Sequence, residues 1–507
     1  MDYRVFPSRI ALVNLFLAAA HLVACSDDEG PTPPTVGDDD PGADGGTGGP
    51  GTGGDGGDSA ESFRVTYSAN GADRGTVPRD EQGYGAGTTV TVLDNEGDLA
   101  RADYPFFSGW NSAADGGGES YSGGEPLVMP EGGITLYATW LDEAKLLAPR
   151  GGAEDYFGAQ IDVQGDYAII ASIEETGGGF VSIHQRTGAN DWDDGFRIET
   201  EEGSSDFGSS VLLVDDYALV GASRSGQYGA VFVYRRTGAN EWTKHDTLTP
   251  PDDSAASFGS SLVANGDRLF IGDDGDGDAG RAAGAVHVYR RVAAGTWAHR
   301  QKITPQGDGD FDLESGQFGH SLDVDGEHLV VGVRGRFLPS GNRAYFLSET
   351  DLGWQHVASV TEGPDDSNFG NSVAIQGEFA IIGASWTNDD SGAVYVYQRE
   401  GTLGWRLVRT LSGAPNSGFG ESLALAGDFA FVGAPGGEVP RGAVHMFRLS
   451  DDGWDWENGN LINPKAGSDN DYFGASLVTS DRFLFVGATS AADLGTESGS
   501  VTTWRYR

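Results

Sequence analysis

Short apolar runs recur in a fixed order over residues 141–507. In one copy, residues 422–426 read Ser-Leu-Ala-Leu-Ala, residues 429–434 read Phe-Ala-Phe-Val-Gly-Ala, and residues 442–447 read Gly-Ala-Val-His-Met-Phe. Short runs bounded by Gly and Asp are typical of β-strands, and Gly427-Asp428 between the first two indicates a tight hairpin. A Gly-containing turn then precedes Trp454, where we expect a fourth strand.

The four-strand unit occurs seven times, and each copy opens on a Phe-Gly pair. Successive pairs are 50 to 60 residues apart. One such unit cannot cover its own apolar faces, whereas a ring of units packs each face against a neighbour. The pattern therefore predicts an all-β fold with a seven-bladed β-propeller over residues 141–507. The pairs begin at Phe157, Phe207, Phe258, Phe318, Phe369, Phe419 and Phe473.

The seventh copy lacks its fourth strand, and the missing piece lies before the first copy. Trp140 to Pro149 reads WLDEAKLLAP, which matches the fourth strand WTKHDTLTP of the second copy. An open ring would leave exposed strand edges. We therefore predict that residues 141–149 close the ring, with Leu146 beside Val501.

These units resemble FG-GAP repeats, which build the propellers of integrin α-chains and many bacterial surface proteins. The resemblance rests on the Phe-Gly pairs and on Val-Gly-Ala at 220–222, 432–434 and 486–488, with Ile-Gly-Ala at 382–384. Calcium-binding members carry an Asp-rich loop between the first two strands. Here that position holds tight turns such as Gly266-Asp267, which cannot surround a calcium ion with six to eight oxygens. The family's calcium sites are therefore not expected.

Residues 63–140 have a different pattern. The ordered motifs VTYSANG, GTVP, FSGWN, MP and ITLYATW resemble the internalin-type B-repeat, a small β-grasp-like module of bacterial surface proteins. The resemblance implies a stalk or spacer with its aromatic residues in a core.

The first 62 residues are typical of a targeting signal followed by a linker. Residues 1–25 combine Arg4 and Arg9 with an apolar run and end in Leu-Val-Ala-Cys, which resembles the lipobox of bacterial lipoproteins. The resemblance implies a lipid on Cys25, although an ordinary secretory signal is the alternative. Residues 26–62 are rich in Gly, Asp and Pro and predict a disordered linker. We expect a lipid anchor in a bacterial cell envelope, and Ser26 favours the outer membrane.

The amino-acid composition excludes some classes of binding partner and metal site. The 507 residues contain 76 Asp and Glu against 32 Lys and Arg, which gives a net charge of −44. This charge argues against nucleic-acid binding, which needs a basic face. The single Cys excludes a disulfide framework and a cysteine-based zinc site.

Strand parity places the variable loops on one face. The loops before each Phe-Gly and after each Gly-Ala share this face, which we call the loop face, while the Gly-Asp hairpins and the turns before each Trp share the opposite hairpin face. Function usually resides in variable loops on a rigid scaffold. We therefore expect a protein or glycan ligand at the acidic residues of the loop face, which are Asp252, Asp253, Asp365, Asp366, Asp389, Asp390, Asp469 and Asp471.

Two adjacent loops could together present carboxylates to a hard cation such as Ca²⁺. One loop belongs to the third copy and the other leads into the fourth, so both lie on the loop face. A solvated Asp/Gly loop is the alternative interpretation. The candidate ligands are Asp274, Asp276, Asp278, Asp308, Asp310 and Asp312.

No catalytic motif such as HExxH or GxSxG is present in the sequence. His287 and His445 occupy the third-strand position that Phe232 fills in the second copy, so they read as ordinary strand residues. We expect a monomeric, non-catalytic cell-surface adhesion or binding protein. The alternatives are a hydrolase or lyase that degrades extracellular polysaccharide or protein, and a structural surface-coat protein.

Overall fold

The computed structural model describes residues 62–505, except for short segments. The segments left out are 98, 100, 102–106, 116, 122, 141–142, 174–177, 189, 200–204, 307–315, 335–341, 365–366, 402–403, 428, 437–440, 451–452, 463–469 and 481–482. The predicted signal, Cys25 and nearly all of the predicted linker therefore lie outside the described residues. Within the described part, no helix is long and apolar enough to cross a bilayer.

Residues 63–140 form a small β-module built around one tryptophan. Strand β6 pairs in parallel with β1 and antiparallel with β3, and β4 extends this sheet, while β2 and β5 form a separate pair. Trp110 is fully buried, and its Nε1 donates a hydrogen bond to the Leu93 carbonyl at 2.9 Å. The strands are β1 (Val65–Ser68), β2 (Thr89–Thr91), β3 (Phe107–Asn111), β4 (Ser120–Tyr121), β5 (Pro126–Val128) and β6 (Ile134–Trp140).

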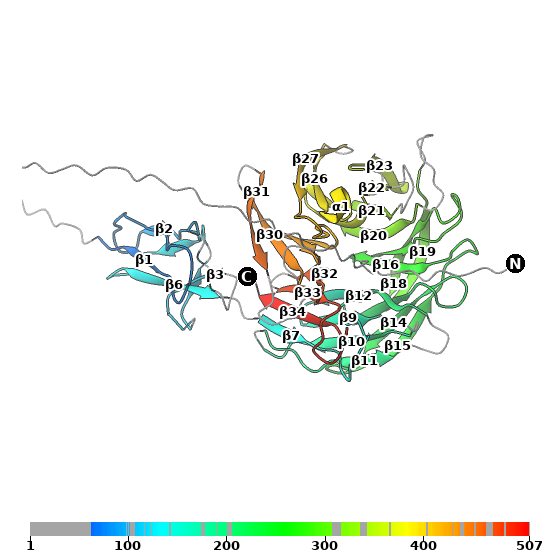
Figure 1. The fold of residues 1–507 in the computed structure, drawn as a ribbon, viewed down its shortest axis with the longest axis horizontal. Helices are drawn as coiled ribbons and strands as arrows, with labels where there is room; N and C mark the ends of the chain where they lie inside the picture. The colour runs from blue at the N-terminus through cyan, green and yellow to red at the C-terminus, as the bar shows by residue number, and fades with distance from the viewer. Residues whose placement is uncertain are drawn as a thin grey trace, which may run out of the picture. The chain divides into compact units, whose positions relative to one another are not determined.

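Seven four-stranded antiparallel sheets form the blades of a β-propeller (Figure 1). The first strands of the blades contact one another in sequence, and β32 contacts β8, so the described strands form a closed ring. These first strands are β8 (Gln160–Gln164), β12 (Phe207–Val214), β16 (Phe258–Asn265), β20 (Phe318–Asp325), β24 (Phe369–Gln376), β28 (Leu423–Ala426) and β32 (Phe473–Thr479).

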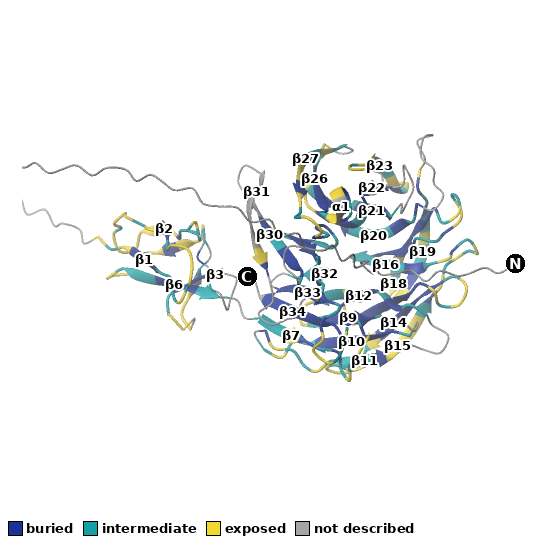
Figure 2. Ribbon diagram, viewed as in Figure 1, coloured by how far each residue is buried: buried dark blue, intermediate teal, exposed yellow. Residues whose placement is uncertain are grey.

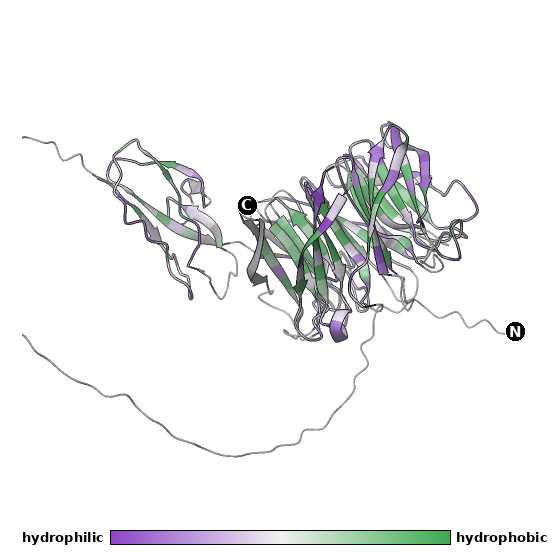
Figure 3. Ribbon diagram, turned by 90° about the horizontal axis from the view of Figure 1, so that it is seen from above, coloured by the Kyte–Doolittle hydropathy of each residue, from purple (hydrophilic) through white to green (hydrophobic). Residues whose placement is uncertain are grey.

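The second and third strands are the most apolar and carry most of the buried positions (Figures 2 and 3). The second strands are β9 (Tyr167–Ser172), β13 (Tyr217–Ala222), β17 (Arg268–Asp273), β21 (His328–Arg334), β25 (Phe379–Ala384), β29 (Phe429–Ala434) and β33 (Phe483–Ala488). The third strands are β10 (Phe180–Gln185), β14 (Ala230–Arg236), β18 (Ala285–Ala293), β22 (Asn342–Thr350), β26 (Ala393–Glu400), β30 (Ala443–Ser450) and β34 (Ser500–Arg505).

The fourth strands form the outer edge of each blade, and the seventh blade borrows its fourth strand from the opposite end of the repeat array. Strand β7 (Glu143–Leu146) pairs antiparallel with β34, and Leu146 lies opposite Val501, which is the pairing that the sequence predicts. The other fourth strands are β11 (Phe196–Glu199), β15 (Trp242–Leu248), β19 (Thr296–Ile303), β23 (Gly353–Val360), β27 (Gly404–Ser412) and β31 (Gly453–Ile462).

The Phe-Gly pair has a backbone reason as well as a packing reason. The phenylalanines are at most 2% exposed, and the glycine that follows has a φ between 90° and 96° in every blade. This backbone conformation is costly for any residue with a Cβ. The pair therefore marks the start of each first strand.

In six of the seven blades, a serine three residues after the phenylalanine links the blade to the next one. Ser372 Oγ, for example, donates a hydrogen bond to the Gly420 carbonyl of the following blade at 2.7 Å, and Ser476 Oγ reaches the Gly158 carbonyl at 2.5 Å across the closure. The first blade is the exception, because Gln160 occupies the serine position and Ala171 replaces the second-strand glycine.

Candidate functional site in the third blade

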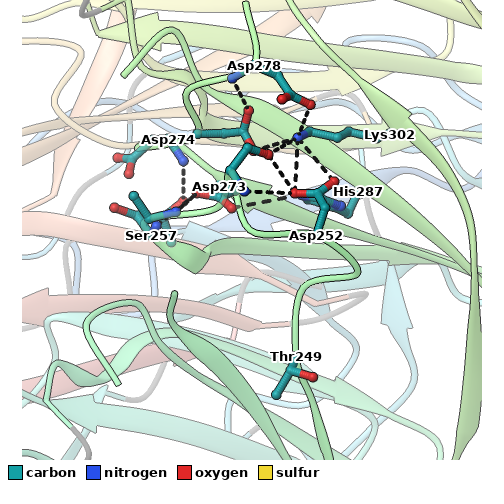
Figure 4. A network of polar contacts seen from close by, with 12 residues as sticks. Thr249, Asp252, Ser257, Asp273, Asp274, Asp278, His287 and Lys302 are labelled. Atoms are coloured by element: carbon teal, nitrogen blue, oxygen red, sulfur yellow. Dashed lines mark hydrogen bonds and ion pairs between the residues drawn. The ribbon is translucent and has the colours of Figure 1, made fainter. Parts of the chain in front are cut away.

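The loop face of the third blade holds a polar cluster where its neighbours are apolar. Strand β17 ends at Asp273, the position that Ala222 and Ala384 occupy in β13 and β25. Strand β18 places His287 opposite Ile271, the position of Phe232 in the second blade. The β17–β18 loop adds further carboxylates, and Lys302 comes from β19 (Figure 4).

Asp273 is fully buried and only half of its carboxylate is satisfied. Its Oδ1 accepts hydrogen bonds from the backbone N–H groups of Ser257 at 2.8 Å and Ala256 at 3.2 Å. Its Oδ2 is buried and has no hydrogen-bond partner among the described residues. Burial raises the pKa of Asp273 to about 7, and the charges of Asp276 and Asp274 add to the increase.

His287 is also fully buried, and neither of its ring nitrogens has a hydrogen-bond partner in the described part of the chain. Its Nε2 lies 3.8 Å from Asp273 Oδ2. The ring packs edge-on against Phe258, with the ring centroids 5.3 Å apart. Burial lowers the pKa of His287 to about 4, and His299 and Lys302 contribute to the decrease. The imidazole is therefore neutral near pH 7 and can act as a ligand.

Lys302 joins the outer carboxylates of the cluster. Its Nζ lies 2.7 Å from Asp276 Oδ2, 2.5 Å from Asp278 Oδ2 and 3.3 Å from Asp252 Oδ2, and it donates a hydrogen bond to Ser254 Oγ at 2.6 Å. Burial alone would lower the pKa of Lys302, but Asp276 and Asp278 raise it. The ammonium group therefore stays charged and fixes the β15–β16 loop to the β17–β18 loop.

The three candidate calcium ligands that the structure describes have different partners. Asp274 Oδ2 pairs with His320 Nδ1 at 3.2 Å, whereas Asp276 and Asp278 pair with Lys302. The remaining three, Asp308, Asp310 and Asp312, lie outside the described residues. Within the part that the structure describes, the His, Cys, Asp and Glu side chains that come together closely enough to hold a metal ion are Asp273, Asp276 and His287.

The candidate ligand-binding residues of the loop face fall into three groups. Asp253 and Asp390 are exposed, the latter in the short helix α1 (Thr387–Asp390), which also contains Asp389. Asp252 is ion-paired with Lys302, and Asp471 is only 4% exposed, so its carboxylate is not offered to a ligand at the surface. Asp365, Asp366 and Asp469 lie outside the described residues.

The sequence interpretation of His287 as an ordinary strand residue misses its environment. Asp273 likewise was not among the candidate ligands. The available signal was the departure from the repeat, because the third blade alone places Asp at the Asp273 position, where the other blades have Ser, Ala or Val. That signal becomes specific only with the register, in which Asp273 lies opposite Ala285, two residues from His287, so that both departures lie on the same face of neighbouring strands.

Comparison with protein families agrees with both predicted modules. The FG-GAP repeat model matches residues 140–182 and 357–397, and the Listeria-Bacteroides repeat domain model matches residues 63–139.

Individual proteins of known sequence or structure are similar to this chain over part of its length or at low sequence identity. A protein of Evansella cellulosilytica named "Putative Gly-rich membrane protein" is 44% identical over 82 residues, which are 15% of this chain and 9% of the relative. The chain thus spans less than a tenth of the length of this curated relative. The solved periplasmic gluconolactonase of Pseudomonas aeruginosa is 18% identical, covers 69% of this chain and 90% of its own, and has a TM-score of 0.45. That likeness is too distant to carry a conclusion about activity. The chain therefore carries a Listeria-Bacteroides repeat domain followed by FG-GAP repeats that form a β-propeller.

Proposed function

We propose that this protein is a non-catalytic binding or adhesion protein of the bacterial cell surface, with its ligand site on the loop face of the propeller. The observation that carries the proposal is the difference between the two faces. On the hairpin face, several aspartates of the tight turns are paired with arginines, as in Arg186–Asp166 and Arg236–Asp216. On the loop face, Asp253 and Asp390 are exposed on connections that differ from blade to blade.

A rigid ring that presents exposed carboxylates on variable loops favours a ligand with cationic or multiple hydroxyl groups. A basic protein surface or a glycan has this chemistry. We propose no reaction at this face, since the Asp273–His287 pair is fully buried and out of reach of a macromolecular substrate.

We further propose that a lipid on Cys25 anchors the chain in the cell envelope. The lipobox-like Leu-Val-Ala-Cys supports this location, and the B-repeat resemblance to surface proteins is consistent with it. The relative named as a membrane protein supports it too, although over 82 residues only. Acidic residues 26–62 would then separate the folded modules from the membrane.

A glycan and protein binding screen with the purified full chain tests the ligand site. We expect a ligand whose binding is weakened by Asp253→Arg and Asp390→Arg together, because both reverse exposed charge on the loop face. The matched control is Glu327→Arg with Glu378→Arg, which reverses two exposed charges in hairpin-face turns.

Equal loss of binding in both double variants would show that only net charge matters and would contradict a specific loop-face site. Turnover of any polysaccharide or protein in the same screen would contradict the non-catalytic assignment.

A further inference from the structure

Asp273, Asp276 and His287 each offer one ligand atom, and these atoms lie within 4.8 Å of one another. They come from the end of β17, from the β17–β18 loop and from β18, so the blade itself brings them together. This group goes beyond the proposed ligand site, because it lies beneath the surface and does not depend on what binds there.

The spacing between His287 Nε2 and Asp273 Oδ2 does not suit a hydrogen bond. At 3.8 Å, the two atoms are farther apart than the usual limit of roughly 3.2 Å. Two ligands of one zinc ion, at roughly 2.0–2.2 Å each, can be separated by this distance. The distance between His287 Nε2 and Asp273 Oδ2 is thus too long for a hydrogen bond but allows both atoms to bind one metal ion.

Both side chains also carry buried polar atoms without a hydrogen-bond partner among the described residues, which is costly. Asp273 Oδ2 and both ring nitrogens of His287 are buried without a hydrogen bond among the described residues. The repeat offers an apolar solution at each position, namely Ala222 and Phe232 in the second blade. A bound cation would satisfy Asp273 Oδ2 and one of the two ring nitrogens of His287.

The charges of the cluster also favour a bound cation. Asp252, Asp276 and Asp278 share the ammonium group of Lys302, and Asp273 adds a fourth carboxyl group beside Asp276. Lys302 thus pairs with Asp276, whereas no Lys or Arg among the described residues forms an ion pair with Asp273. Asp252 and Asp278 are about half exposed at their side chains, so the outer part of the cluster is open to water.

We propose that Asp273, Asp276 and His287 form a binding site for a divalent transition metal ion of the Zn²⁺ type, which fastens the β17–β18 loop to the third blade. A neutral imidazole with two carboxylates is a donor set suited to zinc, whereas Ca²⁺ is bound by oxygen ligands alone. Lys302 acts as a neighbouring residue that orients Asp276 through its Oδ2. The site is separate from the loops between first and second strands.

Zinc titration of the chelator-treated full chain, followed by calorimetry, tests the site. We expect one ion per chain to bind with micromolar or tighter affinity. His287→Phe and Asp273→Ala restore the repeat residues of the second blade, so they should preserve the fold while weakening binding roughly 100-fold. The matched control is His445→Phe, at the same strand position in the sixth blade, where Ala434 replaces the aspartate.

Three results would overturn the proposal. They are the absence of stoichiometric zinc binding by the parent chain, equal affinity in the parent and Asp273→Ala, and displacement of zinc by a tenfold excess of Ca²⁺. Circular dichroism and the melting temperature establish that each variant is folded. Because this readout is metal binding, its failure is distinct from a failure of the ligand screen.

Discussion

At the scale of the residue, some blades place a half-buried carboxylate where other blades have an apolar side chain. Asp323 of β20 is an example beyond the third blade. Its Oδ2 accepts a hydrogen bond from the Ile375 N–H of the next blade at 2.7 Å, and its Oδ1 accepts one from the Val324 N–H at 2.9 Å. Burial nevertheless raises the pKa of Asp323 to about 7. The carboxylate thus bridges two blades at an electrostatic cost.

Asp323 makes stability depend on pH. Its pKa is higher in the folded state than the ordinary value near 4, so the folded state gains a proton first as the pH falls. The stabilisation by protonation is complete below about pH 4 and is lost as the pH rises through about 7. Three pKa units correspond to about 4 kcal/mol, so Asp323→Asn should remove up to about 4 kcal/mol of this dependence between pH 4 and 8, measured by urea unfolding.

The control for this titration is Glu378→Gln, which changes an exposed carboxylate on the hairpin face. It should change the difference in unfolding free energy between pH 4 and 8 by less than Asp323→Asn does. A pH profile of Asp323→Asn that coincides with the parent profile would contradict the assignment.

At the scale of the element, neighbouring blades are linked through a glycine and a serine. Gly383 of β25 faces the Gly420 carbonyl of the next blade and the Ser372 hydroxyl, and a Cβ built on Gly383 would lie 2.2 Å from each oxygen. This close approach explains the glycine of the Val-Gly-Ala motif. The first blade shows the alternative, because Ala171 is found there together with Gln160 in place of the serine.

Gly383→Ala should therefore destabilise the propeller by about 1–3 kcal/mol, because the added methyl group forces the two blades apart. The measurement is chemical unfolding of the full chain. Gly152→Ala is the control, since a Cβ at Gly152 meets no atom within 4 Å. If the two variants were equally stable, the blade contact would not require glycine.

The pattern of apolar residues was sufficient to predict the strands, because a two-residue period and Gly-Asp turns are local features. The pairing of Leu146 with Val501 was also predictable, since one copy lacked a strand that a distant segment resembled. The environment of His287 was not predictable in this way. Its burial depends on Asp273 and Phe258 from separate strands, and single-residue identity cannot distinguish a packed histidine from a ligand.

At the scale of the whole molecule, the ring depends on one short strand. Leu146 of β7 is 4% exposed and packs in a core cluster with Phe157, Phe485 and Val501, which connects the first and seventh blades. The apolar contact therefore joins the two ends of the repeat array. The hydrogen bond from Ser476 to Gly158 reinforces the same junction.

Leu146→Ala should lower the free energy of unfolding by about 2–4 kcal/mol, because it leaves a cavity at this junction. Lys145→Ala is the control, since its ion pair with Asp493 is partly exposed and should contribute at most about 1 kcal/mol. Differential scanning calorimetry of the full chain measures both. Equal melting temperatures for the two variants would contradict the importance of the closure.

The borrowed strand also sets an order of events during synthesis. Strand β7 is made before any complete blade, yet its partner β34 is made after the six other blades and most of its own. Until β34 has been synthesised, the propeller ring cannot close, and β7 has no strand with which to form its hydrogen bonds. If synthesis stopped within the seventh copy, the ring would stay open and expose unpaired strand edges at both ends of the repeat array. Such edges are targets for proteases and for association with other chains.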